Sequence, residues 1–311
     1  MPAPYPLSPQ IQAMLARCLV FAPSENSLAA KRTAFLALCR DFTGNRPAGL
    51  TQQDVDLDGL TLRVYQPETE QPENGWPTLL YLHGGGWNMG GLDSHDWFAY
   101  EVARRLHIAI VAVAYRLAPE HPYPAALQDS LTALRTLRTG RVLNSLSSDR
   151  LVVCGESAGG TLAAALCMAL RESGEKQPLG QALLYPVLTA FEDLSSAHEC
   201  ADAPFLTSAA VRASIEGYLP DRTDWNSPLA MPLAATDYTA LPPTFIGVAQ
   251  FDSLRDHGIE YHHRLLEAGI DSRLYIGQGL VHGCLRDDSI PEVAALYEQF
   301  IRHVADFLTG A

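Results

Sequence analysis

Gly155-Glu156-Ser157-Ala158-Gly159 is the stretch of sequence that decides the fold. It follows the apolar run Leu151–Cys154 and precedes a helical pattern over residues 158–172. A Gly-x-Ser-x-Gly pentapeptide at such a junction predicts a tight strand-to-helix turn that presents a serine hydroxyl at a helix N-terminus. Backbone N–H groups and the helix dipole favour developing negative charge there. Ser157 is therefore the candidate nucleophile; the alternative is a glycine-rich turn without catalytic meaning.

A second glycine-rich stretch, His83-Gly84-Gly85-Gly86-Trp87, ends the strand-like run 78–82. Acyl transfer needs fixed donors for an oxyanion, and glycines allow backbone N–H groups to face it without a Cβ in the way. The candidate donors are the N–H groups of Gly85, Gly86 and Ala158, with Gly84 beside them. A plain loop and a phosphate-binding loop are the alternatives, although no Gly-Lys-Ser/Thr follows. We expect His83 to anchor the loop by a hydrogen bond rather than to act as a base.

The candidate acid and base each follow a late strand-like run. Asp252 is the first carboxylate beyond the run 244–250, and its rival, Asp256, stands one helical turn further on. His282 lies in a Gly-Leu-Val-His-Gly stretch just past the run 273–276. A serine hydroxyl needs a histidine to take its proton, and that histidine needs an acid to fix its tautomer. The order Ser157, Asp252, His282 is the one that serine hydrolases of the α/β-hydrolase type use.

Other histidines compete for the role of the base, and all of them fall within predicted helices. We expect them to be surface or packing residues. The spacing of three of them around Glu260 does not match the His-Glu-x-x-His zinc pattern, so no metal site is predicted. The competing residues are His257, His262, His263 and His303.

The wider pattern predicts an α/β fold. From residue 54 onward, β-like runs alternate with helical patterns, which is typical of parallel strands joined by crossover helices. Ile108–Tyr115 has no polar alternation, as expected for a central strand buried on both faces. Asp58-Gly59 predicts a two-residue hairpin turn, and Ser94 is the expected N-cap of a helix over 95–107.

Two segments do not fit this alternation. Residues 1–48 carry two amphipathic helical patterns, and residues 189–225 are expected to form helix and loop. Both could simply pack on the sheet. The sharper interpretation is a cap over the carboxyl ends of the strands, where open α/β sheets bind ligands. We expect a single domain over residues 1–311, with these two segments as its cap.

Composition limits the partners and the compartment. The net charge of −13 over 311 residues argues against nucleic acid and membrane surfaces as partners. The start of the chain lacks the basic and long apolar stretches of a signal peptide, so we expect a cytoplasmic protein. The six cysteines lack Cys-x-x-Cys spacing and are expected to be free thiols. The oligomeric state stays open, with a homodimer among the alternatives.

These motifs together resemble the hormone-sensitive-lipase-type family of bacterial esterases, which includes acetyl esterases. Further similar segments are Tyr115–Ala126, Leu184–Pro186 and Phe251–Gly258, and the resemblance covers about residues 60 to 285. Three positions depart from the family pattern: Glu156 replaces Asp, Ser253 replaces Pro, and Cys284 stands where Phe often follows His-Gly. They leave the shape of the acyl pocket and the pH optimum open.

The resemblance implies an α/β-hydrolase fold with a mostly parallel eight-stranded sheet, flanking helices and a helical cap. It also implies no cofactor and hydrolysis of short-chain acyl esters of small molecules through a Ser-His-Asp triad and an acyl-enzyme. The nearest rival is an amidase or formamidase with the same residues. A rival of another class is a non-catalytic hydrolase fold that binds a small ligand, although such proteins usually lack a triad member. Long-chain lipase action fits poorly with an acidic chain that has no apolar anchor.

Overall fold

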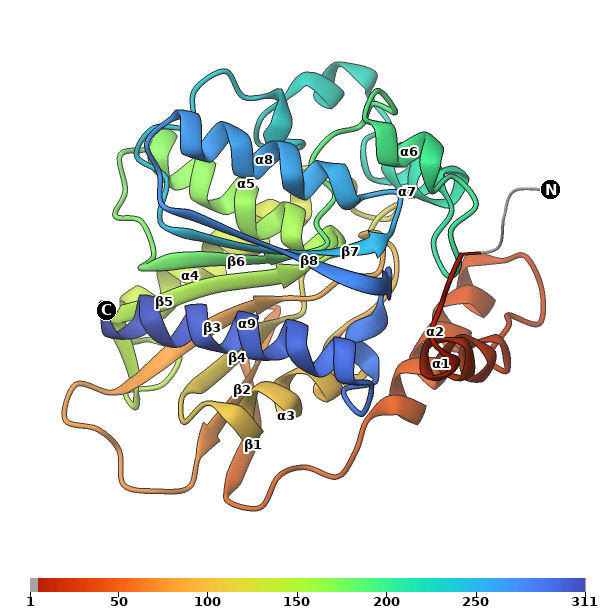
Figure 1. Cartoon of the computed structure of the whole chain (residues 1–311). Coiled ribbons are helices and arrows are strands. Elements are labelled where there is room, and N and C mark those ends of the chain that lie inside the picture. The colour runs from red at the N-terminus through yellow and green to blue at the C-terminus, as the bar shows by residue number, and fades with distance from the viewer. Residues whose placement is uncertain (1–4, 311) are drawn as a thin grey trace.

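The computed structural model describes residues 5–310 and places eight strands in one sheet. The order across the sheet is β1-β2-β4-β3-β5-β6-β7-β8, with β1 and β2 antiparallel to their neighbours and all other pairs parallel (Figure 1). The predicted mostly parallel, eight-stranded sheet is confirmed. The strands are β1 (Leu50–Leu57), β2 (Leu60–Pro67), β3 (Trp76–Leu82), β4 (Ala109–Val113), β5 (Leu146–Glu156), β6 (Gly180–Leu184), β7 (Thr244–Phe251) and β8 (Ser272–Val281).

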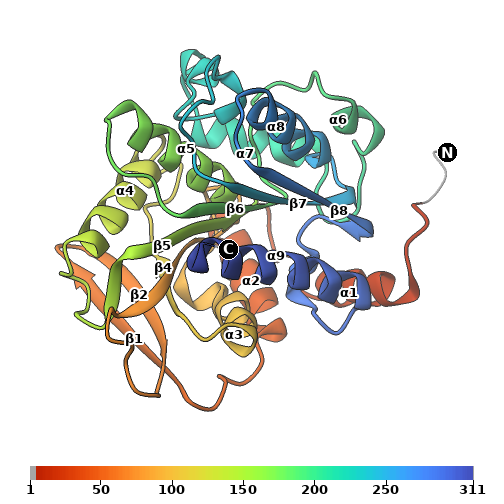
Figure 2. The same ribbon diagram turned by 60° about the vertical axis from the view of Figure 1, so that its left-hand side comes forward.

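Helices cover both faces of the sheet. α4, α5 and α8 lie on one face, and α3 and α9 lie on the other (Figures 1 and 2). Successive residues of the central strands enter opposite layers: Leu80 packs in the cluster below α5, whereas Leu79 packs in the cluster below α9. The helices are α1 (Pro9–Leu19), α2 (Leu28–Phe42), α3 (Asp96–Arg105), α4 (Ala125–Arg138), α5 (Ala158–Glu172), α6 (Ser195–Glu199), α7 (Ser208–Tyr218), α8 (Arg255–Glu267) and α9 (Pro291–Thr309).

Two local predictions have different outcomes. The hairpin turn forms at Asp58 and Gly59, whose φ angles of 53° and 96° suit a two-residue turn. The predicted N-cap at Ser94 is wrong, because this residue ends a short 3-10 turn, and α3 begins only at Asp96. The Ser94 hydroxyl donates to the Gly91 carbonyl at 2.9 Å instead.

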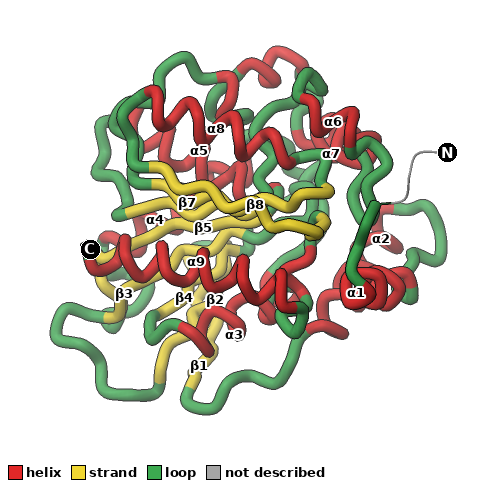
Figure 3. Tube along the Cα trace, in the orientation of Figure 1, coloured by secondary structure: helices red, strands yellow, loops and turns green. Residues whose placement is uncertain are grey.

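The two segments that do not fit the α/β alternation lie at one end of the sheet. α1 and α2 come from the N-terminal segment, and α6 and α7 from the segment between β6 and β7 (Figure 3). All four lie toward the edge where the parallel strands end (Figure 1). Between residues 5 and 310, none of the helices has both the length and the apolar character that a bilayer crossing requires.

Candidate active site

Ser157 sits on a strained turn between β5 and α5. Its φ of 57° and ψ of −121° lie in a region that non-glycine residues rarely adopt. The flanking glycines are required for close approach: a Cβ on Gly155 would lie 2.1 Å from the Gly159 carbonyl oxygen. A Cβ on Gly159 would lie 1.9 Å from the carbonyl oxygen of Leu82. The pentapeptide therefore allows α5 to start directly against the end of β3.

His282 lies within hydrogen-bonding distance of both Ser157 and Asp252. His282 Nε2 is 2.9 Å from Ser157 Oγ, and His282 Nδ1 is 2.7 Å from Asp252 Oδ2. Asp252 is fully buried, and its second oxygen accepts the Leu254 N–H at 2.9 Å. The three residues follow β5, β8 and β7, whose carboxyl ends are close together in the sheet. The structure thus brings together the three residues that the sequence singled out.

In the glycine-rich loop after β3, the backbone N–H groups of the last two glycines are free within the described part of the chain, whereas that of the first is hydrogen-bonded. Gly85 and Gly86 have φ angles of 114° and 61°. Their N–H groups and that of Ala158 meet no acceptor among residues 5–310. The Gly84 N–H, in contrast, donates to the Glu156 carboxylate. Gly84 is therefore corrected from a candidate oxyanion donor to a loop anchor, because its only N–H is already engaged.

His83 anchors this loop through contacts of its ring and its backbone. Its ring stacks on Tyr115 at 4.2 Å between centroids, and the Tyr115 hydroxyl donates to the His83 carbonyl oxygen at 2.6 Å. Burial lowers the pKa of His83 to about 3. A ring that stays neutral and stacked cannot reach Ser157 as a base, in agreement with the expected anchoring role.

The rival acid and bases lie outside this arrangement. Asp256 accepts the Ser196 N–H at 2.8 Å and pairs with Arg255. His257 is buried, and its Nδ1 accepts the Leu188 N–H at 3.0 Å. The remaining three histidines, which contact other groups or face solvent, are His262, His263 and His303. In the described part of the chain, no cluster of side chains could hold a metal ion.

Two buried charged residues near the site were not among its predicted members. Glu156, beside the nucleophile, places a carboxylate oxygen 3.1 Å from His95 Nε2 as well as on the Gly84 N–H. Arg286 is 8% exposed and lies in the 3-10 turn after His282. The substitution of Glu for the usual Asp was the one visible signal for the first. Nothing in the local pattern distinguished the second from a surface arginine.

A cavity of about 250 Å³ contains the reactive groups. Ser157, His282, Gly85 and Gly86 line it together with apolar side chains from α2 and from the segment before and within α7. These apolar residues are Phe35, Phe205, Leu206, Ala210 and Val211. A cavity of this volume can hold a small ester, and Ser157, Gly85 and Gly86 all lie along its wall.

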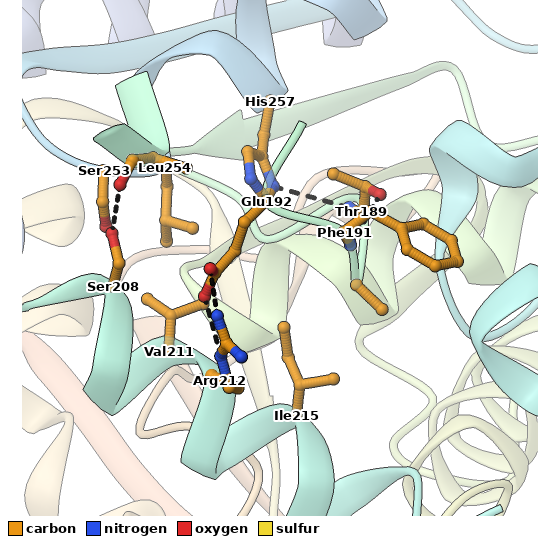
Figure 4. Close-up of a pocket in the computed structure, with 12 residues that line it drawn as sticks. Thr189, Phe191, Glu192, Ser208, Val211, Arg212, Ile215, Ser253, Leu254 and His257 are labelled. Carbon is orange, nitrogen blue, oxygen red and sulfur yellow. Dashed lines mark hydrogen bonds and ion pairs between the residues drawn. The ribbon is translucent and has the colours of Figure 1, made fainter. Parts of the chain in front are cut away.

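A second, smaller cavity is lined by Ser253, Leu254 and His257 and contains none of these groups (Figure 4). His257 faces it and accepts the Thr189 N–H at 3.4 Å, and Arg212 pairs with Glu192 at its other side. Its volume of about 20 Å³ has room for one water molecule and not for a substrate.

Known proteins resemble this chain in sequence and in fold. A family model described as "alpha/beta hydrolase fold" matches residues 79–286, and one described as "Carboxylesterase family" matches residues 26–120. Carboxylesterase NlhH of Mycobacterium tuberculosis is 38% identical over 240 residues, covering 75% of each chain. The ethyl acetate hydrolase of Pseudomonas putida is 33% identical over 240 residues, covering 76% of each. A crystal structure of an esterase from the bacterial hormone-sensitive lipase family shares the fold, with a TM-score of 0.85 at 24% identity over 97% of this chain and 98% of that one.

Proposed function

The chain belongs to the hormone-sensitive-lipase-type family of α/β-hydrolase esterases and hydrolyses carboxylic esters; we propose that it acts on short-chain acyl esters with Ser157, His282 and Asp252 as its catalytic triad. The observation that carries the proposal is the continuous hydrogen-bonded chain from Asp252 through His282 to Ser157 at the wall of the cavity. The relative named ethyl acetate hydrolase and the size of the cavity support short substrates.

In the first half of the reaction, His282 Nε2 takes the proton of Ser157 Oγ, and the oxygen attacks the ester carbonyl. Asp252 accepts the Nδ1–H bond and stabilises the imidazolium. The N–H groups of Gly85, Gly86 and Ala158 hold the oxyanion, each contributing about 3 kcal/mol to the lowering of the barrier. The alcohol leaves with the proton from Nε2, and the acyl group stays on Ser157.

In the second half, a water molecule occupies the place of the alcohol. His282 takes its proton, the hydroxide attacks the acyl-enzyme carbonyl, and the same N–H groups hold the second oxyanion. Ser157 leaves with the proton from His282, which releases the acid. The sequence of steps needs no group beyond the residues named.

We also propose that the chain forms one domain whose cap consists of about residues 1–48 and 189–225, of which residues 1–4 lie outside the described part of the chain. Phe35 from α2, with Leu206 and Val211 from the second segment, supports this assignment because their side chains line the cavity. The Tyr5 hydroxyl donates to Asp202 at 2.7 Å, which links the two segments. A cap that closes the cavity in this way limits the length of acyl chain that fits.

The test is a series of p-nitrophenyl esters from acetate to dodecanoate with Ser157→Ala as control. We expect fast turnover of the short members, a steep fall with acyl length, and a loss of kcat of at least about 10⁴-fold in the variant. Turnover that persists in the variant would rule out Ser157 as the nucleophile. No turnover by the folded protein would favour a non-catalytic ligand-binding role.

An amidase or formamidase with the same residues is the second candidate, since the triad and the donors serve either leaving group. Matched ester and anilide substrates separate the two, because an amide nitrogen must be protonated before it leaves. We expect kcat/KM to be higher for the ester of each pair. A preference for the anilide would reverse the assignment.

We propose a cytoplasmic location and small-molecule esters as the ligands. Free thiols at all six cysteines fit a reducing compartment. Cell fractionation followed by an esterase assay tests the location. Light scattering coupled to gel filtration decides between a monomer and the homodimer that the sequence leaves open.

A further inference from the structure

Arg286 is a cation at the wall of the cavity, and the proposed mechanism does not use it. It stands four residues after His282 and lines the same space of about 250 Å³ as Ser157. The residue is only 8% exposed. A charge this far buried is costly unless other groups satisfy it, so its surroundings decide what it does.

Three aromatic rings surround the guanidinium. Its central carbon lies 5.4 Å from the ring centroid of Phe35, 5.7 Å from that of Trp97 and 5.0 Å from that of Phe205. The rings come from α2, from α3 and from the segment before α7, and their faces attract a cation without neutralising it. They hold the guanidinium beside the cavity without supplying a counter-ion.

The donors of Arg286 are only partly used. Nη1 donates to the Gly283 carbonyl oxygen at 2.8 Å and the guanidinium also contacts the Cys39 side chain, whereas Nε is buried without a partner. Within residues 5–310, no carboxylate forms an ion pair with this guanidinium at 4.0 Å or less. Glu156, which lines the same cavity and acts on Arg286 only at longer range, already accepts the Gly84 N–H and lies 3.1 Å from His95.

We propose that Arg286 is a carboxylate-binding subsite, so that the preferred substrates are short esters with a second, anionic carboxylate group. The inference rests on the proposed function and adds the substrate class to it. A guanidinium presents planar, paired donors that match a carboxylate, and the aromatic rings exclude the water that would screen the pair. The carboxylate can belong to the acyl part, as in half-esters of dicarboxylic acids, or to the alcohol part, as in acyl esters of hydroxy acids.

Two matched substrate pairs test the subsite and distinguish its sources. For the acyl side, kcat/KM is measured on monomethyl glutarate and on its neutral analogue methyl 5-oxohexanoate. For the alcohol side, the pair is acetoxyacetate and acetoxyacetone. In each pair a carboxylate replaces an acetyl group of similar size, so the ratio of the two kcat/KM values isolates the effect of the charge.

We expect wild-type enzyme to favour the charged member of one pair, and Arg286→Gln and Arg286→Met to lower that ratio about 100-fold. Arg286→Lys keeps the positive charge and should therefore retain part of the wild-type kcat/KM ratio. Arg212→Gln is the matched control, because Arg212 has an exposed side chain (57%), pairs with Glu192 and does not line the cavity. This control should leave both ratios unchanged.

Equal ratios in wild type and the Arg286 variants, with neutral esters still hydrolysed, would overturn the subsite alone. Absence of turnover of every ester by wild type would instead overturn the proposed function and the subsite with it. If the variants do not fold, inhibition of methyl hexanoate hydrolysis by glutarate and by neutral glutaramide decides the question in wild type. Stronger inhibition by glutarate supports the subsite, and equal inhibition contradicts it.

Discussion

Glu156 connects the turn that carries Ser157 to the loop that carries the free N–H groups. Its buried carboxylate accepts the Gly84 N–H and lies 3.1 Å from His95 Nε2. A Cβ on Gly84 would lie 2.3 Å from the same carboxylate, so the loop and the side chain are fitted closely. Glu156 is therefore a positioning residue that sets the distance between the nucleophile and Gly85.

Replacement of Glu156 by Ala should lower kcat about 100-fold with little change in KM, because the Gly84 N–H loses its acceptor and the loop shifts. Glu156→Gln keeps an acceptor oxygen and should retain most of the activity. Steady-state kinetics on p-nitrophenyl acetate checks both variants. Equal losses in the two variants would mean that the charge, rather than the hydrogen bond to Gly84, is what matters.

His257 makes folding sensitive to acid. Burial lowers its pKa to about 4, well below the usual value near 6.5, while its Nδ1 accepts the backbone N–H of Leu188. Between these two pH values the unfolded chain binds a proton that the folded chain does not. The stabilising contribution is therefore complete above about pH 6.5 and is lost as the pH falls toward 4.

Replacement of His257 by Asn should reduce this loss, because the amide oxygen can accept the same N–H without titrating. The drop in the free energy of unfolding between pH 7.5 and 5.0 should be smaller than in wild type by on the order of 2 kcal/mol. Urea unfolding at the two pH values measures it. His263→Asn, at an exposed position of the same helix, is the control and should show the wild-type drop.

At the residue scale, the sequence predicted that the three residues of the proposed triad would lie together. It did not predict which other side chains hold them and the glycine loop in place. Ser157, Asp252 and His282 each follow a recognisable strand, so their proximity could be inferred from the topology. The bond from Gly84 to Glu156 joins positions 72 apart and depends on side-chain packing. The aromatic rings around Arg286 come from three distant segments, and no local pattern marks them.

At the scale of elements, one arginine joins α2 to the loop beside the nucleophile. Arg32 donates to the carbonyl oxygens of Asn88 at 2.7 Å and Ala118 at 3.0 Å, and it pairs with Glu120 at 2.7 Å. Asn88 follows the glycines by two residues. The position of this N-terminal helix is thus coupled to the loop that carries Gly85 and Gly86.

Replacement of Arg32 by Ala should lower the free energy of unfolding by about 1–2 kcal/mol and raise KM, because α2 loses two backbone contacts. Glu120→Gln removes only the exposed ion pair and should leave both quantities nearly unchanged. Denaturant unfolding and steady-state kinetics test the pair of variants. A KM that is equally altered in both would contradict a role for the backbone contacts.

Most elements could be predicted from hydrophobic pattern, but their ends could not. β4 and α5 coincide closely with their apolar runs. β8 extends to Val281, well beyond the predicted 273–276, because its pairing with β7 resumes past Gly277 and Gly279 after a register shift. Backbone pairing of this kind is set by the neighbouring strand and leaves no side-chain pattern.

At the scale of the whole molecule, strand order assembles the site. β5, β6, β7 and β8 are consecutive neighbours, so the residues that follow β5, β7 and β8 reach one edge of the sheet. The two segments outside the α/β alternation lie toward that edge as well (Figure 1). The geometry of the site therefore depends on the pairing of these four strands.

The cysteines allow a test of the packing of the whole chain. All six thiols are free, five are buried, and burial raises the pKa of each. We expect Ellman's reagent to modify only the half-buried Cys18 quickly in native protein and all six after unfolding without reductant. A lower count in denaturant would reveal a disulfide and contradict the free thiols.

The direction of α9 has a consequence for immobilising the enzyme on a solid support. The helix begins at Pro291, shortly after His282, and runs back along β8 to Thr309 at the opposite end of the sheet (Figure 1). A surface attached through the C-terminal end would therefore face away from the cavity mouth and leave diffusion of ester into it unhindered. Attachment near Tyr5, which contacts Asp202 of the proposed cap, would place the support beside the entrance.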